Sequence, residues 1–206
     1  MAVARNYQIG RRRMPDESRQ KSRSGQTGRA VRKLDRRSER TRRALHGAFT
    51  KLLLESGYEG LKVADILERA DVGRSTFYQH YRGKEDLLRQ SVTHMFAVLA
   101  ETVTGSGVPP GLVAIVAHMR ENRRLARALY RGAVRLLLSR RLAELIEPNL
   151  PAALILPRPL AARQIAEAQL GLLEAWLTGT IACRPEEIAA ALHATSAAMA
   201  LALAAA

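Results

Sequence analysis

The segment DVGRSTFYQHYRGKEDLL, residues 71–88, gathers polar side chains that could bind a partner through hydrogen bonds. They alternate with Phe77, Tyr78 and Tyr81, although aromatic residues make up only 4% of the sequence. Phe77 and Tyr81 are four residues apart, the spacing at which two side chains share one face of a helix. If these two and Val72 face a core, a surface rich in hydrogen-bond donors and acceptors remains outside: Arg74, Ser75, Thr76, Tyr78, Gln79 and His80.

Four short helices are predicted to position this segment. Apolar residues at helical spacing predict a first helix from residue 36, which ends at SGYEG with Gly57 as a left-handed cap. The same spacing predicts a second helix over residues 63–70. Residues 71–73 form a turn of the length found between the two helices of a helix-turn-helix. Residues 74–81 then form a third helix that is too short to be stable without tertiary contacts.

The segment that follows, RGKEDLL, opens a fourth helix. Glu85 and Asp86 lie in its first turn, where acidic side chains favour the helix dipole. The stretch FTKLLLESGYEGLKVADILERADVGRSTFYQHYRGKEDLL resembles the DNA-binding domain of the TetR family of transcriptional repressors, over residues 36–97. The resemblance implies an all-α fold with an N-terminal three-helix helix-turn-helix DNA-binding domain, its motif at about residues 62–81. It also implies a C-terminal helical ligand-binding and dimerisation domain over residues 98–206.

The resemblance also implies roles for individual residues. Thr76, Tyr78, His80 and Lys84 match positions that in the family mostly contact backbone phosphates. Arg74, Ser75 and Gln79 match variable positions that tend to read bases, and the chemistry agrees, because arginine pairs with guanine and glutamine with adenine in the major groove. For each of these residues the alternative is a solvated polar side chain, and Tyr78 could instead be a packing aromatic.

Two residues depart from the family pattern. Lys62 stands where a hydroxyl residue usually caps the second helix; it can reach a phosphate by its charge but cannot cap. Gly73 stands where serine commonly precedes the third helix, so that one hydroxyl contact is lost while the helix N-terminus stays accessible.

The charge of the chain points to a polyanionic partner. Its formal net charge is +14, and half of that excess lies in residues 1–35, which we expect to be a disordered basic N-terminal arm. The arm could contact DNA, could be only a solubilising extension, or could precede the true start at Met14.

The implied partners are a double-stranded DNA operator, a second copy of the chain and a small-molecule effector. The alternative function is a non-specific, nucleoid-type DNA-binding protein.

Residues 98–206 are predicted to form further helices. They cover residues 112–121, 122–131, 133–146, 160–178 and 185–203, and the last two resemble the helices that form the dimer interface in the family. Candidate residues for a ligand cavity are His118, Met119 and Trp176, with core packing as the alternative for each. Five arginines near one helical face could instead hold an acidic effector or be solvated: Arg120, Arg124, Arg127, Arg131 and Arg135.

Other function classes lack sequence support. No phosphate loop, metal cluster or nucleophile with its base is recognisable, so we expect no catalytic residues, no metal and no cofactor. The single cysteine, Cys183, cannot form an internal disulfide, and the N-terminus lacks a signal-peptide core, which together favour the cytoplasm. The alanine-rich residues 189–206 indicate close helix packing and not a membrane span.

Overall fold

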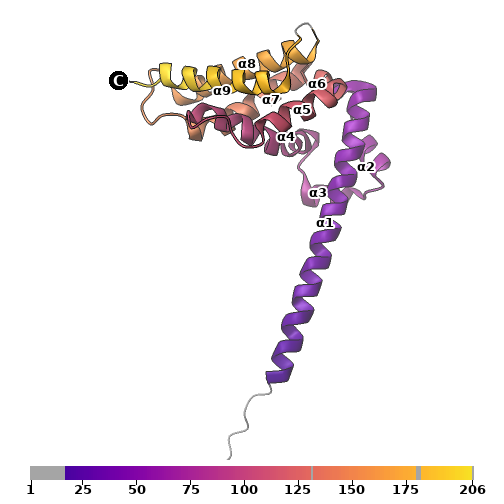
Figure 1. Cartoon of the computed structure of the whole chain (residues 1–206). Coiled ribbons are helices and arrows are strands. Elements are labelled where there is room, and N and C mark those ends of the chain that lie inside the picture. Colours follow the sequence, from indigo (N-terminus) through magenta and orange to yellow (C-terminus); the bar gives the residue numbers. More distant parts are fainter. Residues whose placement is uncertain (1–16, 131, 180–181, 206) are drawn as a thin grey trace, which may run out of the picture. The chain divides into compact units, whose positions relative to one another are not determined.

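The structure is a computed structural model that describes residues 17–130, 132–179 and 182–205, with side chains from residue 36 onward. The chain divides into two compact units, residues 1–41 and 42–206, and each is described by itself. The described residues form nine α-helices with two short 3₁₀ turns: α1 (Glu17–Gly60), α2 (Val63–Ala70), α3 (Arg74–His80), α4 (Lys84–Ala100), α5 (Leu112–Glu121), α6 (Arg123–Leu129), α7 (Gly132–Ile146), α8 (Arg158–Leu177) and α9 (Pro185–Ala202) (Figure 1).

The predicted all-α fold is confirmed for the described ranges. They contain no β-strand, and Leu154 and Ala204 form an isolated bridge. No helix in these ranges is long and apolar enough to cross a membrane.

In the first unit the structure differs from the prediction of disorder. The sequence predicts residues 1–35 to be a disordered arm; residues 1–16 lie outside the described residues, but residues 17–41 belong to α1. Arginine, lysine, glutamine and alanine are all good helix formers. A lack of apolar periodicity therefore shows that this segment has no hydrophobic face to bury, but it does not exclude a helix.

The second unit begins with the part of α1 that carries an apolar stripe. Leu45, Phe49 and Leu53 are buried, as their spacing predicts. The helix is interrupted at Gly57, whose φ of 70° and ψ of 172° form a combination that glycine alone adopts readily. Glycine at this point lets the chain turn towards α2.

The turn between α2 and α3 has the predicted length. Asp71 takes the left-handed conformation at the end of α2, and its backbone N–H donates to the carbonyl of Glu68. Aspartate tolerates this conformation better than most residues do. Gly73 is extended and precedes α3, and its carbonyl accepts the N–H of Phe77 at 3.1 Å. The two helices are thus joined by the three residues Asp71, Val72 and Gly73.

Later helices of the second unit form a packed bundle. Helix α7 packs against α4 and α8, while α9 packs against α5 and α8. Helix α9 begins with Pro185 in its first turn, followed by Glu186 and Glu187, as the sequence predicts. The predicted bounds of α5 agree with the structure, and the other C-terminal helices agree to within a few residues.

Candidate nucleic-acid interface

Helix α3 presents a polar face and buries an aromatic one. Phe77 has no exposed surface and Tyr81, directly after the helix, is 2% exposed. Burying one such ring contributes about 1.5 to 3 kcal/mol, which a helix of this length needs in order to persist. The ring of Tyr78 is half exposed. Phe77 and Tyr81 are thus buried and Tyr78 is exposed as the sequence predicts, whereas Val72, predicted to face the core, is half-buried.

The outward face of α3 carries the residues that the sequence singled out. Arg74, Ser75, Tyr78 and Gln79 are exposed, while Thr76 and His80 are half-buried. The Arg74 guanidinium lies 5.9 Å from the centre of the Tyr78 ring, which favours an extended position of the arginine along the helix. These side chains form one surface of donors and acceptors, and we call Arg74, Ser75, Tyr78 and Gln79 the α3 face.

Lys62 precedes α2 with an exposed side chain. That side chain makes no cap hydrogen bond, as predicted. Instead, a side chain within α2 binds the backbone of Lys62: the carboxylate of Asp65 accepts the backbone N–H of Lys62 at 3.2 Å. The ammonium group of Lys62 is thus available for an anionic partner.

Lys84 has contacts within the protein that the sequence did not reveal. Its Nζ donates to the carbonyls of Tyr58 at 2.9 Å and Leu61 at 2.8 Å, and lies 4.6 Å from the centre of the Tyr58 ring. Tyr58 lies in the last turn of α1, after Gly57, and Leu61 lies between α1 and α2, so the ammonium group joins this segment to the start of α4. Lys84 therefore has a structural role, and a contact between it and phosphate stays a prediction.

A hydrogen-bonded chain of three side chains anchors the end of α3. The Tyr81 hydroxyl lies 3.1 Å from Nε2 of His46 on α1, and Nδ1 of His46 lies 2.8 Å from Oγ of Ser91 on α4. The Ser91 hydroxyl donates to the carbonyl of Leu87, so it accepts from Nδ1–H, and Nε2 accepts from the tyrosine. We call Tyr81, His46 and Ser91 the α3 anchor.

The anchor histidine is held in its neutral form. Burial of the imidazole, followed by the positive charge of Arg42, lowers the pKa of His46 below its ordinary value of 6.5. The sequence reasoning missed His46 and Ser91. Their partner Tyr81 is 35 residues from His46, and a single polar residue beside an apolar stripe gives no signal of such a contact.

A cavity of about 460 Å³ lies in the second unit between α1, α4, α5 and α6. Its floor is made of buried apolar side chains that include Phe49, Leu53, Leu88 and Val92. His46 and Ser91 of the α3 anchor belong to its wall. Two of the three predicted ligand candidates, His118 and Met119, also line it.

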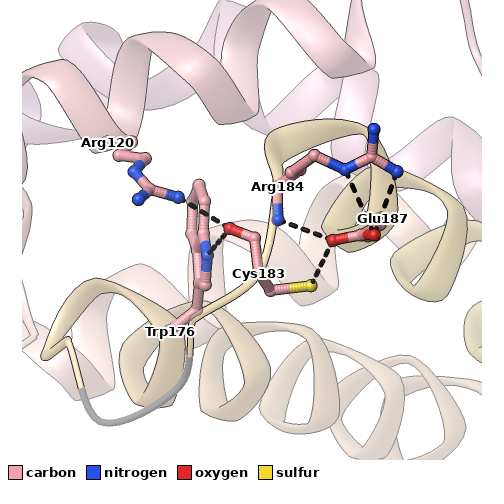
Figure 2. Close-up of polar contacts among 5 residues, drawn as sticks. All are labelled: Arg120, Trp176, Cys183, Arg184 and Glu187. Carbon is pink, nitrogen blue, oxygen red and sulfur yellow. Dashed lines mark hydrogen bonds and ion pairs between the residues drawn. The ribbon is translucent and has the colours of Figure 1, made fainter.

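Trp176, the third candidate, lies outside this cavity and secures the connection between α8 and α9. Its Nε1 and the Arg120 guanidinium both donate to the carbonyl of Cys183, at 2.9 and 2.6 Å (Figure 2). The Cys183 thiol donates to Glu187, and this hydrogen bond, together with burial, raises the thiol pKa. A raised pKa disfavours the reactive thiolate.

Three of the five arginines proposed for an acidic effector make other contacts in the described structure. Arg120 lies over the Trp176 ring at 5.4 Å, and Arg127 donates to the carbonyls of Leu177 and Thr178 at the end of α8. Arg135 pairs with Glu167 at 2.8 Å. Arg131 lies outside the described residues. No group of three or more His, Cys, Asp or Glu side chains in the described part of the chain could hold a metal ion.

Comparisons with known proteins find similarity centred on the helix-turn-helix. Residues 45–90 match the family model of bacterial regulatory proteins of the tetR family. The chain is 38% identical over 77 residues to the HTH-type transcriptional regulator YxbF of Bacillus subtilis, across 37% of this chain and 20% of that protein. It is 35% identical over 65 residues to the HTH-type transcriptional repressor DhaR of a Mycobacterium species, across 30% of this chain and 33% of that protein. The matches thus span a third or less of the length of these relatives.

One solved structure extends the similarity into the later helices. The TetR transcriptional regulator of Streptococcus agalactiae is 25% identical, with a TM-score of 0.53, across 81% of this chain and 98% of that one. These matches are to regulators of transcription. They agree with the predicted fold, in which a helix-turn-helix domain is followed by a helical domain.

Proposed function

We propose that this chain, whose residues 45–90 match the tetR-family model, is a ligand-responsive transcriptional repressor of that family. It binds a near-palindromic operator as a homodimer. Repression is supported by the similarity to DhaR, which is named as a repressor. Such a regulator acts in the cytoplasm, where the bacterial chromosome lies.

The observation that carries this proposal is the α3 face. Arg74, Ser75 and Gln79 are exposed together on one helix that is anchored from behind by buried Phe77 and Tyr81. Arginine can pair with both guanine acceptors, and glutamine with adenine, in the major groove. Tyr78 of this face is assigned to phosphates together with Lys62, Thr76 and His80, and such contacts position the helix without reading sequence.

Dimer formation is supported by the exposed surface of α8 and α9. Ala168 and Gly171 on α8, and Ala190, Ala194 and Ala198 on α9, are exposed small residues that would let helices of a second copy approach closely. The Leu201 side chain, 77% exposed, adds an apolar contact at the end of α9. Two copies would hold two α3 faces in fixed relation, as two operator half-sites require.

Effector control is supported by the position of the cavity. Its wall is shared by α1 and α4, which hold α3, and by α5 and α6 of the following bundle. A ligand bound there would contact α1 and α4 as well as α5 and α6. Binding would change the separation of the two α3 faces, so that both no longer fit successive major grooves about 34 to 36 Å apart.

Selection of bound sequences from random DNA tests the assignment of the readers. The wild-type chain should enrich a near-palindromic site, while the Arg74→Ala, Gln79→Ala double variant should lose base preference at particular positions of each half-site. A lost bidentate base contact costs about 1 to 3 kcal/mol. Arg140→Ala, at an exposed arginine on α7, removes the same charge as a control.

Each outcome of this selection decides between the two candidate functions. The control should enrich the wild-type site. An identical sequence logo for wild type and double variant would contradict the assignment of Arg74 and Gln79. Binding without enrichment of any sequence would instead support the alternative, a non-specific nucleoid-type protein held to DNA by its basic residues.

A further inference from the structure

The lining of the cavity between α1, α4, α5 and α6 contains no formally charged side chain among the described residues. This is notable in a chain with 33 basic and 19 acidic residues. An ionised ligand in such a site would lose hydration without gaining a counter-charge, which is costly. The cavity therefore selects against ions.

The cavity lining combines buried apolar side chains with more exposed polar ones. Besides the floor residues given above, buried Met119 and Ala126 line it from α5 and α6. Polar side chains lie at its more exposed positions: His46, Thr50, Ser91, His94, His118 and Asn122. A volume of about 460 Å³ lies within the range of small-molecule sites, in which an apolar lining is combined with a few polar groups.

The polar groups nearest to α3 are those of the α3 anchor. His46 and Ser91 line the cavity, and they also hold each other and Tyr81 by hydrogen bonds of 2.8 and 3.1 Å. A ligand hydroxyl or amine that donates to Nε2 of His46 competes with the Tyr81 hydroxyl for that acceptor. Tyr81 would then lose its partner at the end of α3.

We propose that this cavity binds an uncharged, largely apolar small molecule with one hydrogen-bonding group, and that occupancy is transmitted to α3 through His46. The inference rests on the proposed function for its biological meaning, because it names the effector class and the transmitting residue. Its physical content, binding and loosening of α3, is independent of DNA. It can therefore fail or succeed separately from operator binding.

A matched pair of fluorescent probes tests the ligand class. N-phenyl-1-naphthylamine is uncharged and carries one N–H donor, and 1-anilinonaphthalene-8-sulfonate is the same skeleton with a negative charge. The full-length chain should bind the uncharged probe at least about tenfold more tightly than the sulfonate, which equals about 1.4 kcal/mol. Equal or tighter binding of the sulfonate would overturn the assignment.

Filling the cavity locates the bound probe. Ala114→Trp places an indole at an exposed cavity-lining position of α5, whereas Ala133→Trp does so at an exposed position of α7 that does not line the cavity. Ala114→Trp should weaken the uncharged probe about tenfold or more, and Ala133→Trp should leave it unchanged. The same affinity in both variants would show that the probe binds elsewhere and would overturn the proposal.

Hydrogen exchange of α3 in the absence of DNA tests the transmission. Saturating N-phenyl-1-naphthylamine should speed amide exchange in residues 74–81 of the wild type severalfold. Tyr81→Phe keeps the ring but removes the hydroxyl. In this variant residues 74–81 should exchange faster without the probe, and adding the probe should raise their exchange rate little further. Tyr58→Phe, at a half-buried tyrosine outside the α3 anchor, should behave like the wild type. Unchanged α3 exchange in the wild type with bound probe would contradict transmission through His46.

Discussion

His46 shows how one side chain can join three helices of the DNA-binding domain. It lies on α1, bonds to Tyr81 at the end of α3 and to Ser91 on α4, and is kept neutral by burial. In the unfolded chain the same imidazole titrates near 6.5. Protonation must therefore act against the folded state, because Nε2–H⁺ can no longer accept from Tyr81.

The lowered pKa of His46 makes the stability of the fold depend on pH. Because the folded-state pKa of His46 is lowered, its contribution to the free energy of unfolding is complete above 6.5 and declines as the pH falls towards the folded-state pKa. The difference in unfolding free energy between wild type and His46→Gln should therefore shrink between about pH 7.5 and about pH 5. Urea titrations at both pH values measure it, and a difference that is constant with pH would contradict the neutral anchor.

Residue roles were only partly predictable from the sequence. The buried Phe77 and Tyr81 and the exposed Arg74 and Gln79 follow from helical periodicity, and the structure agrees with that division. The carbonyl contacts of Lys84 and the carbonyl shared by Arg120 and Trp176 do not, because they join residues far apart in the chain. Periodicity indicates which face of a helix is buried, but it does not identify the polar partners on other elements.

At the scale of elements, glycine has opposite effects at two positions of α1. Gly47 lies in the helix, where a methyl group added at its Cα would meet open space, whereas Gly57 has a φ of 70° that other residues rarely adopt. Gly47→Ala should stabilise the chain by about 0.5 to 1 kcal/mol, and Gly57→Ala should destabilise it by about 1 to 3 kcal/mol. Thermal unfolding of the two variants checks both signs, and a stabilising Gly57→Ala would contradict the interruption of α1 there.

A second element-scale prediction concerns α9. Ala194 and Ala198 are exposed and small, so replacing both with arginine should place two charges per chain in a close helix interface and shift dimer to monomer. Sedimentation at micromolar protein measures the change. Ala133→Arg, at an exposed position of α7 outside α8 and α9, provides the comparison. A monomeric wild type, or a double variant that remains fully dimeric, would contradict the proposed interface.

The presence of each helix was more predictable from the sequence than its length. The second to fourth helices and the turn at Asp71–Gly73 follow from apolar spacing and turn chemistry, and the structure has them at the predicted positions to within a few residues. The extension of α1 back to Glu17 does not follow from apolar spacing, because residues 17–35 have no apolar stripe. Helix propensity alone favours a helix there, and it is a weak signal.

At the scale of the whole molecule, the uneven charge predicts salt-dependent binding. Residues 1–35 carry half of the net charge of +14. If they neutralise three phosphates per chain, deleting them should flatten the slope of log affinity against log salt by about five units for a dimer. Operator and random DNA should be affected alike, since phosphate contacts do not specify sequence.

A length-matched control separates the effect of charge from the effect of removing the segment. Replacing the arginines and lysines of residues 1–35 with glutamine should flatten the slope as much as the deletion does. An unchanged slope after deletion would mean that the segment only solubilises the chain. A reduced ratio of operator to random affinity would mean that it reads bases in the minor groove.

Sequence-specific recognition by α3 is decided by comparing two affinities at one fixed salt concentration: that for a selected operator and that for scrambled DNA of the same length and composition. A regulator that reads bases through two α3 faces should prefer the operator by about 10³-fold or more. The Arg74→Ala, Gln79→Ala variant should lose most of that preference while keeping its affinity for scrambled DNA. Equal affinity of the wild-type chain for both DNAs would contradict sequence-specific recognition by α3.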